Sequence, residues 1–98
     1  MNYITELNTF YDRLPTRRLS PSAIALYGVL MHLANRAHWP AAFSVAESTL
    51  VGILGLSGRS MRRARAELVA AGVVKHEPRP GRQAPVYKLA CLSTIMDL

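Results

Sequence analysis

The residues in this sequence best suited to specific chemistry are arginines, and they gather in one stretch. Eight of the twelve Lys and Arg residues lie between Arg59 and Lys88, against two acids there, Glu67 and Glu77. The other acids and bases balance, so this segment holds the whole formal net charge of +6. Charge gathered in this way indicates a polyanionic partner, either nucleic acid or an acidic membrane surface.

An apolar pattern around Gly55 is typical of a helix-turn-helix unit. Such a unit needs glycine where the first helix ends and apolar residues at fixed offsets, so that the second helix crosses the first at a set angle. The residues five and one before Gly55, and one, six and nine after it, are all apolar: Leu50, Leu54, Leu56, Met61 and Ala64. Val51, four before Gly55, is larger than the residue usual there. The pattern predicts two helices joined at Gly55.

The second of these helices is predicted over residues 59–71, with Ser57 as its cap and a left-handed Gly72 at its end. At about 100° per residue, Arg59 and Arg63 project outward near its N-terminal end, with Arg62 on the flank. Residues near a helix N-terminus can reach base edges in the major groove. The predicted DNA contacts on this helix are Ser57, Arg59, Ser60, Arg62 and Arg63. The alternative is a solvated basic face on an ordinary helix.

Arg65 lies at the edge of the inward face, where leucine would be expected. We expect it to be structural, with its stem packed inward and its guanidinium paired with a carboxylate. The candidate partners are Asp12, Glu6 and Glu47. A contact to DNA is the alternative for this arginine.

A basic hairpin is predicted to follow. Residues 73–77 and 86–89 have strand character, and residues 78–82 form the turn. Arg79 and Arg82 flank this turn and can lie along a phosphate backbone or enter the minor groove; otherwise they only keep the hairpin soluble. Lys75 joins the predicted DNA contacts, and Pro85 predicts an edge position for the second strand.

Three further elements are predicted from local signals. Ser20 caps a helix that starts at Pro21, ends near residue 35 and is apolar on nearly every side, as in a central helix. Residues 43–45 favour a short strand. Ser44 and Glu47 form a capping box for a helix over residues 45–54.

Residues 2–14 are predicted to form an amphipathic helix that Pro15 stops. Its broad aromatic stripe either packs on the protein's own core or forms part of a subunit contact. The candidate self-association residues are Tyr3, Leu7 and Phe10, and we expect a homo-oligomer.

The remaining residue types do not suggest an enzyme. His32, His38 and His76 lack metal-ligand spacing, and Cys91 has no evident base partner. We therefore expect no catalytic residue, no metal and no cofactor. The longest apolar run is too short for a membrane span, and the first residues lack the features of a signal peptide. One cysteine permits no internal disulfide, so a cytoplasmic location without membrane binding is expected.

The sequence from Asn2 to about Leu92 resembles the N-terminal winged-helix domain of DnaD-like replication proteins of phages and mobile elements. The similar segments are residues 1–8 with Phe10-Tyr11, Leu19-Ser20, residues 23–26, Trp39-Pro40, residues 43–46, residues 55–57, residues 63–65 and Glu67-Leu68. The resemblance implies DNA binding, self-association and a contact with replication proteins during initiation. Full-length members of that family add a C-terminal domain, so we expect these residues to be either an excised domain or a minimal, stand-alone variant.

Together the patterns predict a mainly α winged helix-turn-helix with a small β-hairpin wing, formed by residues 1–92 and followed by a tail at 93–98. The expected partner is double-stranded DNA, in replication of a phage or mobile element. A small transcriptional repressor and a winged helix that binds protein are the alternatives.

Overall fold

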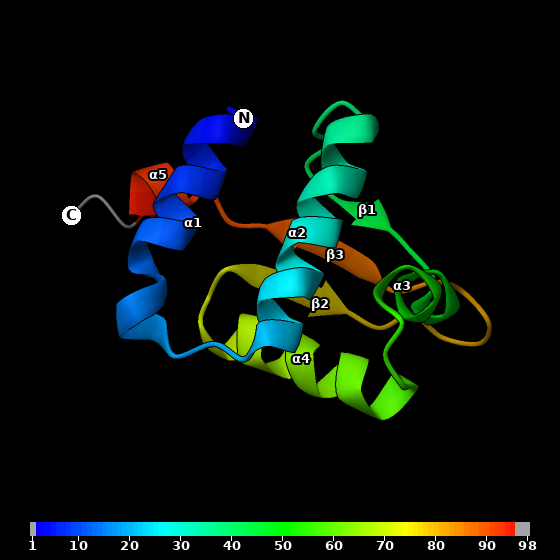
Figure 1. The fold of residues 1–98 in the computed structure, drawn as a ribbon. Helices are drawn as coiled ribbons and strands as arrows, with labels where there is room; N and C mark the ends of the chain where they lie inside the picture. Colours follow the sequence, from blue (N-terminus) through cyan, green and yellow to red (C-terminus); the bar gives the residue numbers. More distant parts are fainter. Residues whose placement is uncertain (1, 96–98) are drawn as a thin grey trace.

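The computed structural model describes residues 2–95, which form five helices and three short strands (Figure 1). In chain order they are α1 (Tyr3–Arg17), α2 (Pro21–Arg36), β1 (Phe43–Ser44), α3 (Glu47–Leu54), α4 (Gly58–Ala70), β2 (Val74–Glu77), β3 (Val86–Leu89) and α5 (Leu92–Ile95). The fold is therefore mainly helical with a small antiparallel sheet, as the sequence predicts at that level.

Local capping fixes where most helices begin and end. The side chains of Asn2, Ser20 and Ser57 each accept a hydrogen bond from the backbone N–H three residues ahead, which satisfies one of the free donors of a first helical turn. Gly55 and Gly72 have φ of 69° and 76°, the left-handed conformation that glycine adopts without steric cost. The predicted caps at Ser20 and Ser57 and both predicted glycine turns are confirmed.

The expectation that Pro15 stops the first helix is wrong, because α1 continues through it to Arg17. Proline removes one N–H donor and its ring crowds the carbonyl four residues earlier, but its fixed φ is compatible with helix and a single distorted turn at a helix end costs less than one in the middle. Pro15 is exposed in the last turn, so its ring meets no packed neighbour there. The helix ends instead at Arg18, whose N–H donates to the Leu14 carbonyl at 3.3 Å.

The predicted capping box of Ser44 and Glu47 does not form. Ala46 is the N-cap of α3 and provides no side-chain hydrogen bond, and the helix starts at Glu47 instead of residue 45. The Glu47 carboxylate accepts hydrogen bonds from arginines of α4 instead. A charged guanidinium is a stronger donor than a backbone N–H, so the tertiary contact overrides the local one.

The sheet has the order β1-β3-β2, with both pairs antiparallel. β3 is thus the central strand, and the edge position predicted from Pro85 is wrong. Proline is tolerated because the ladder begins one residue later, at Val86. The Pro85 carbonyl accepts a hydrogen bond from the Val45 N–H at 3.3 Å, which joins β1 to this end of β3.

The hydrophobic core lies between α2, the sheet and α4. Six side chains of α2 are buried, as expected for a central helix: Ala23, Leu26, Tyr27, Leu30, Met31 and Ala34. Leu50 of α3 and Met61, Ala64 and Leu68 of α4 pack against them. In Figure 1, α2 crosses in front of the sheet, α4 runs below it, and α1 lies beside α5. The inward face predicted for the helix after Gly55 is therefore the buried face of α4.

The chain end described by the structure is helical rather than an extended tail. Leu92–Ile95 form α5, and Leu92 is buried beside α1. Glu6 of α1 explains this helix, because its carboxylate accepts hydrogen bonds from the N–H of Leu92 at 2.6 Å and from the hydroxyl of Ser93 at 2.7 Å. A carboxylate from α1 thus caps the first turn of α5. The predicted tail is corrected over residues 93–95, and residues 96–98 lie outside the described part.

Candidate nucleic-acid interface

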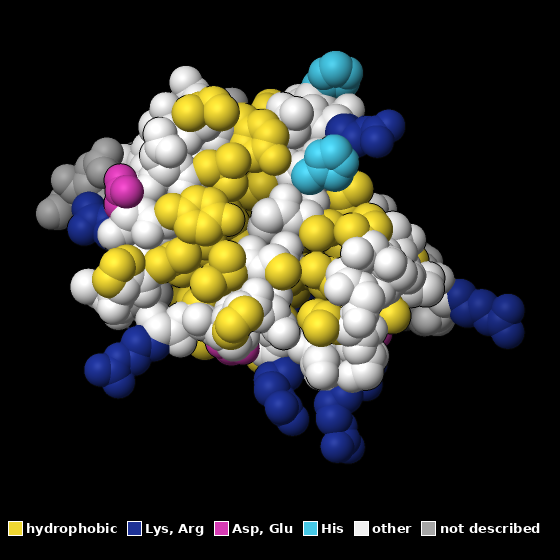
Figure 2. All heavy atoms as spheres, in the orientation of Figure 1, with side chains coloured by type: hydrophobic (Ala, Val, Ile, Leu, Met, Phe, Trp, Pro, Cys, Tyr) yellow, Lys and Arg dark blue, Asp and Glu magenta, His cyan; other side chains and the backbone are white. Residues whose placement is uncertain are grey.

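The outer face of α4 exposes three arginines in its first half, Arg59, Arg62 and Arg63. Met61 and Ala64, on the opposite side of the same turns, are fully buried, so the buried side fixes which way the arginines point. Figure 2 shows Lys and Arg side chains projecting from the lower edge of the molecule, where α4 lies in Figure 1. The first half of the exposed face of α4 is therefore basic, whereas its second half exposes Ala66, Val69 and Ala70.

Ser57 and Ser60, the two predicted polar contacts, are already engaged with each other. The Ser57 hydroxyl accepts from the Ser60 N–H, and the two hydroxyl groups are 3.1 Å apart. This arrangement starts α4 and holds Arg59 at the beginning of the helix. Ser57 is exposed and Ser60 half-buried, so both border the arginines, and capping is the role that the contacts give to Ser57.

Arg65 lies at the centre of a partly buried polar cluster. Its side chain is 11 % exposed, and its Nη1 donates to Glu47 Oε1 at 2.9 Å and to the Tyr87 hydroxyl at 3.1 Å. Glu47 is one of the three carboxylates that the sequence suggested. The pair joins α4 to the start of α3, and the tyrosine joins both to the central strand, so Arg65 holds three elements together.

The electrostatics of this cluster favour both charged forms. Burial raises the pKa of the Glu47 carboxyl, but the hydrogen bond from Arg65 and its positive charge outweigh burial and hold the pKa below its usual value. Burial lowers the pKa of Arg65, and the bonds to Tyr87 and Glu47 more than offset it, so its pKa is raised. Both groups stay ionised at neutral pH.

Arg62 shares the same carboxylate more loosely. Its Nη1 lies 3.4 Å from Glu47 Oε2, and its side chain is 53 % exposed. An exposed ion pair at this distance contributes little to stability. The guanidinium of Arg62 is thus tethered at one edge of the basic face and remains accessible.

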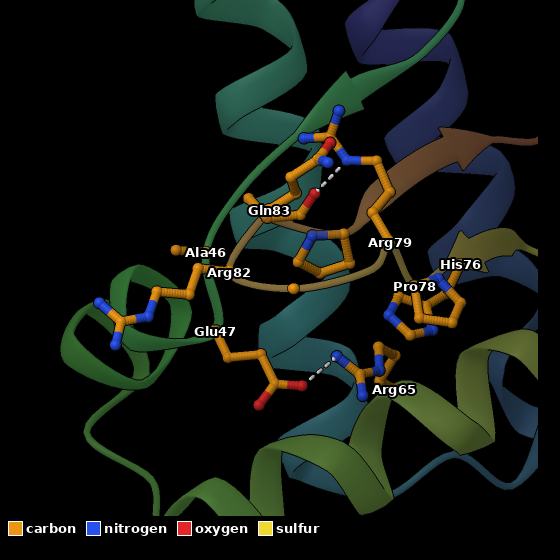
Figure 3. Close-up of a pocket in the computed structure, with 11 residues that line it drawn as sticks. Ala46, Glu47, Arg65, His76, Pro78, Arg79, Arg82 and Gln83 are labelled. Carbon is orange, nitrogen blue, oxygen red and sulfur yellow. Dashed lines mark hydrogen bonds and ion pairs between the residues drawn. The ribbon is translucent and has the colours of Figure 1, made fainter.

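The hairpin loop, residues 78–85, hangs beside the start of α3 and the middle of α4. Arg79 donates from Nε to the Ala84 carbonyl at 2.6 Å, which braces the loop, and Gly81 has a left-handed φ of 67°. Arg82 is exposed, and in Figure 3 its guanidinium points away from the hollow beneath the loop. Both arginines therefore occupy the outer surface of the loop, and only Arg79 is held in place.

Beneath the loop lies an open hollow of ≈ 350 Å³ whose lining includes Glu47, Arg65, His76, Arg79 and Arg82 (Figure 3). The His76 ring packs on Tyr87 with centroids 5.2 Å apart, and its Nε2 is buried without a hydrogen-bond partner among the described residues. Burial lowers the pKa of His76, and the positive charge of Arg65 lowers it further. The hollow separates α4 from the loop and keeps a neutral histidine on its wall.

Lys75 does not join this face. Neighbouring residues of a strand point to opposite sides of a sheet, and His76 faces α4. Lys75 pairs in register with Lys88 and borders a different hollow with it, on the outer side of the sheet. The structure therefore separates Lys75 from the arginines with which the sequence grouped it.

The three residues proposed for self-association pack within the protomer to different extents. Phe10 is 2 % exposed and stacks on Tyr27 with ring centroids 3.8 Å apart, so it is part of the protein's own core. Tyr3 and Leu7 are half-buried, and Tyr3 contacts the Trp39 ring edge-on at 5.5 Å. The large hydrophobic side chains that α1 leaves exposed among the described residues are Ile4 and Tyr11, at 67 % and 50 %.

One contact behind the basic face was not predicted from the sequence. Glu67, in the second half of α4, accepts hydrogen bonds from the N–H and the hydroxyl of Ser20, the N-cap of α2. The two residues are 47 positions apart, and no local pattern signals such a pairing. This contact holds one side of α4, the side that carries Arg63, against the first turn of α2.

The described part of the chain holds no group of three or more His, Cys, Asp or Glu side chains placed to bind a metal ion. Burial raises the pKa of the Tyr27 hydroxyl, and the nearby Glu6 charge adds to this effect. Within residues 2–95, none of the helices is both long and apolar enough to cross a membrane.

The chain was compared with models of protein families, with curated proteins and with solved structures, and it matches none of them.

Proposed function

We propose that this protein is a winged helix-turn-helix domain that binds double-stranded DNA, with α4 as the recognition helix. The observation that carries the proposal is the exposed row of Arg59, Arg62 and Arg63 on a helix whose opposite side is anchored in the core. A rigid helix with arginines near its N-terminus fits the major groove, where arginine pairs with the guanine edge. The hairpin loop, residues 78–85, is the wing.

The surroundings of α4 support this assignment. α3 and α4 are joined through the left-handed Gly55, and both pack on α2. Two arginines of the wing stand on the outer surface of the hairpin, where they can reach a phosphate backbone. Of the two acids near these arginines, Glu47 is compensated by its ion pair with Arg65, and Glu67 is held against α2 by the hydrogen bonds from Ser20.

A titration of a labelled 20-base-pair duplex, followed by fluorescence anisotropy, tests the proposal. We expect binding at about 50 mM salt that weakens by orders of magnitude at about 200 mM, as contacts to six or more phosphates require. The double variant R59A/R63A should bind much more weakly at the same thermal stability. Absence of duplex binding by the intact protein at low salt would overturn the proposal and leave protein binding as the role of this surface.

We propose replication of a phage or mobile element as the setting, on the resemblance to DnaD-like domains carried by residues such as Gly55, Ser57 and Arg65. A transcriptional repressor would use the same helix on another target. Footprinting on the DNA of the phage or mobile element distinguishes these two roles. A replication protein should protect repeats at an origin, whereas a repressor should protect a promoter.

A further inference from the structure

Arg18 occupies a backbone conformation that does not suit its side chain. It is the C-cap of α1 and is left-handed, with φ 54° and ψ 43°. Glycine and asparagine are the usual residues at such helix ends, because a Cβ is crowded there. A long side chain kept in a strained conformation suggests that the side chain has a use.

The fold itself does not provide that use. Arg18 is exposed, and among the described residues its side chain makes no hydrogen bond or ion pair. Its one contact of this kind is made by the backbone, from its N–H to the Leu14 carbonyl. The guanidinium is therefore free to meet a partner from solution.

The position of Arg18 extends the basic face of α4. Arg18 lines an open hollow of ≈ 350 Å³ together with Ala70 and Ala71, at the end of α4. A second hollow, which includes Arg63, shares Glu67 with the first, so the two follow one another along the same side of the helix. In Figure 1 the loop between α1 and α2 passes beside α4, and in Figure 2 Lys and Arg side chains also project from that corner.

One acid borders this corner, and among the described residues it forms no ion pair with the arginines there. Glu67 lines the hollow, and its two oxygens accept hydrogen bonds from the neutral N–H and hydroxyl of Ser20, which hold the carboxylate against the start of α2. Glu6, which offsets an arginine in a count along the sequence, is buried against α5. The balance that the sequence suggests for the N-terminal segment therefore does not hold in space.

We infer that Arg18 is a further contact to the DNA backbone, at the opposite end of α4 from its first arginines. The inference rests on the proposed function. α4 has 13 residues and is about 20 Å long, whereas the major groove is about 12 Å wide. A helix lying in that groove places Arg59 near the bases and Arg18 near the phosphates at its rim, while the wing reaches the backbone beside α3.

Substitution by glycine separates this role from a structural one. R18G removes the guanidinium and relieves the left-handed backbone, so the melting temperature should stay the same or rise. Duplex affinity should nevertheless fall about fivefold to tenfold at about 100 mM salt, equally for all sequences, and the salt slope should fall by about one. R18K should keep most of the slope. R36A is the matched control, since Arg36 is an exposed arginine at the far end of α2.

Each outcome of these titrations bears on the inference. Wild-type affinity and salt slope in R18G would overturn it while leaving the proposed function intact. A lower melting temperature in R18G with unchanged DNA binding would also overturn it, and would make Arg18 a cation that stabilises the C-terminal end of α4. A wild-type protein that binds no duplex would overturn the proposed function as well.

Discussion

The carboxylate of Glu67 joins α4 to Ser20, the residue that starts α2. It accepts the Ser20 N–H at 2.9 Å and the Ser20 hydroxyl at 2.6 Å, while the Ser20 oxygen accepts the Ala23 N–H at 3.1 Å. A charged acceptor strengthens both bonds. The helix that carries the basic face is thereby fixed to the helix that forms the core.

We predict that E67A destabilises the protein by about 1–3 kcal/mol, because the Ser20 N–H and hydroxyl lose a charged acceptor in a partly buried site. E67Q keeps one acceptor oxygen and should cost less. Urea denaturation measures both. E77A is the matched control, since Glu77 is exposed and pairs with exposed Lys88, so its loss should cost about 0–1 kcal/mol. An E67A protein as stable as E77A would show that the contact does not hold α4.

Elements governed by neighbouring residues could be predicted from the sequence. Ser20 and Ser57 cap helices because each serine oxygen reaches an N–H three residues ahead, and Gly55 must be left-handed for α3 to turn into α4. The exposed and buried sides of α4 follow from helical periodicity alone. The same periodicity predicts Arg59 and Arg63 on the outer face.

Contacts between residues that are distant in the sequence cannot be predicted from local patterns. Helical periodicity predicts Arg65 at the inner edge of α4, but it leaves three carboxylates as candidate partners. The tertiary fold decides among them, because it places Glu47 within hydrogen-bond distance of Arg65. Glu6 meets Leu92 across 86 positions, so α5 could not be foreseen. The predictions from Pro15 and Ser44 are wrong for a related reason, because each rests on a local preference of about 1–3 kcal/mol. Near a helix end the cost of proline is smaller, and at Ser44 a tertiary contact of Glu47 overrides the local capping box.

We predict that R65A lowers stability by about 1–3 kcal/mol, because it strips the closest partner from a partly buried carboxylate and leaves the Tyr87 hydroxyl unpaired. R62A breaks the longer, exposed pair to the same Glu47 and should cost less than about 1 kcal/mol. Thermal melts of the two variants measure the difference. The assignment of Arg65 fails if R65A keeps wild-type stability and abolishes DNA binding.

We predict that protonation of Glu6 at acidic pH weakens the packing of α5 on α1. Burial raises the pKa of this carboxyl, but the hydrogen bonds from Ser93 and the Leu92 N–H outweigh burial, so the pKa lies below the ordinary 4.5. A lowered pKa means that the stabilisation is fully present above about pH 4.5 and is lost as the pH falls through the folded-state value. Wild type should therefore be more stable than E6Q at pH 7, and the gap should close toward pH 3. A gap independent of pH in melts of both proteins would contradict this.

We propose that the protein self-associates through the hydrophobic side chains that α1 and α2 expose between them (Figure 2). Sedimentation should show a dimer or larger species at micromolar concentration. Deleting α1 is a poor test because Phe10 belongs to the core. I4S/Y11S changes two exposed side chains and should shift the protein toward monomer, with a small loss of stability because the Tyr11 ring packs edge-on against Phe10 at 5.5 Å. I53S, which alters an exposed isoleucine on α3, is the control. A wild type that is strictly monomeric at high concentration would refute the proposal.

The arginines of α4 and of the wing should differ in what they recognise. Arg59 and Arg63 project from a rigid helix whose buried side fixes their direction, so they can hold the geometry that a base edge requires. R59A or R63A should cost about 1–3 kcal/mol on the preferred site and narrow the gap to random DNA. Selection of bound sequences from a random duplex pool, followed by anisotropy titrations on that site and on random DNA, measures this gap.

Arg79 and Arg82 lie on the outer surface of a loop, where we expect them to contact phosphate oxygens, and such contacts carry no sequence information. R79A or R82A should weaken all duplexes alike and lower the salt slope by about one each. Arg79 braces its loop through the Ala84 carbonyl, so its loss should also loosen the wing. R79K, which keeps the charge without the Nε donor, separates these two effects. The residues that recognise sequence are those whose removal changes the ratio of affinities for the preferred site and for random DNA. If the wing variants change this ratio more than R59A and R63A do, the wing recognises the sequence and α4 only contacts the DNA backbone.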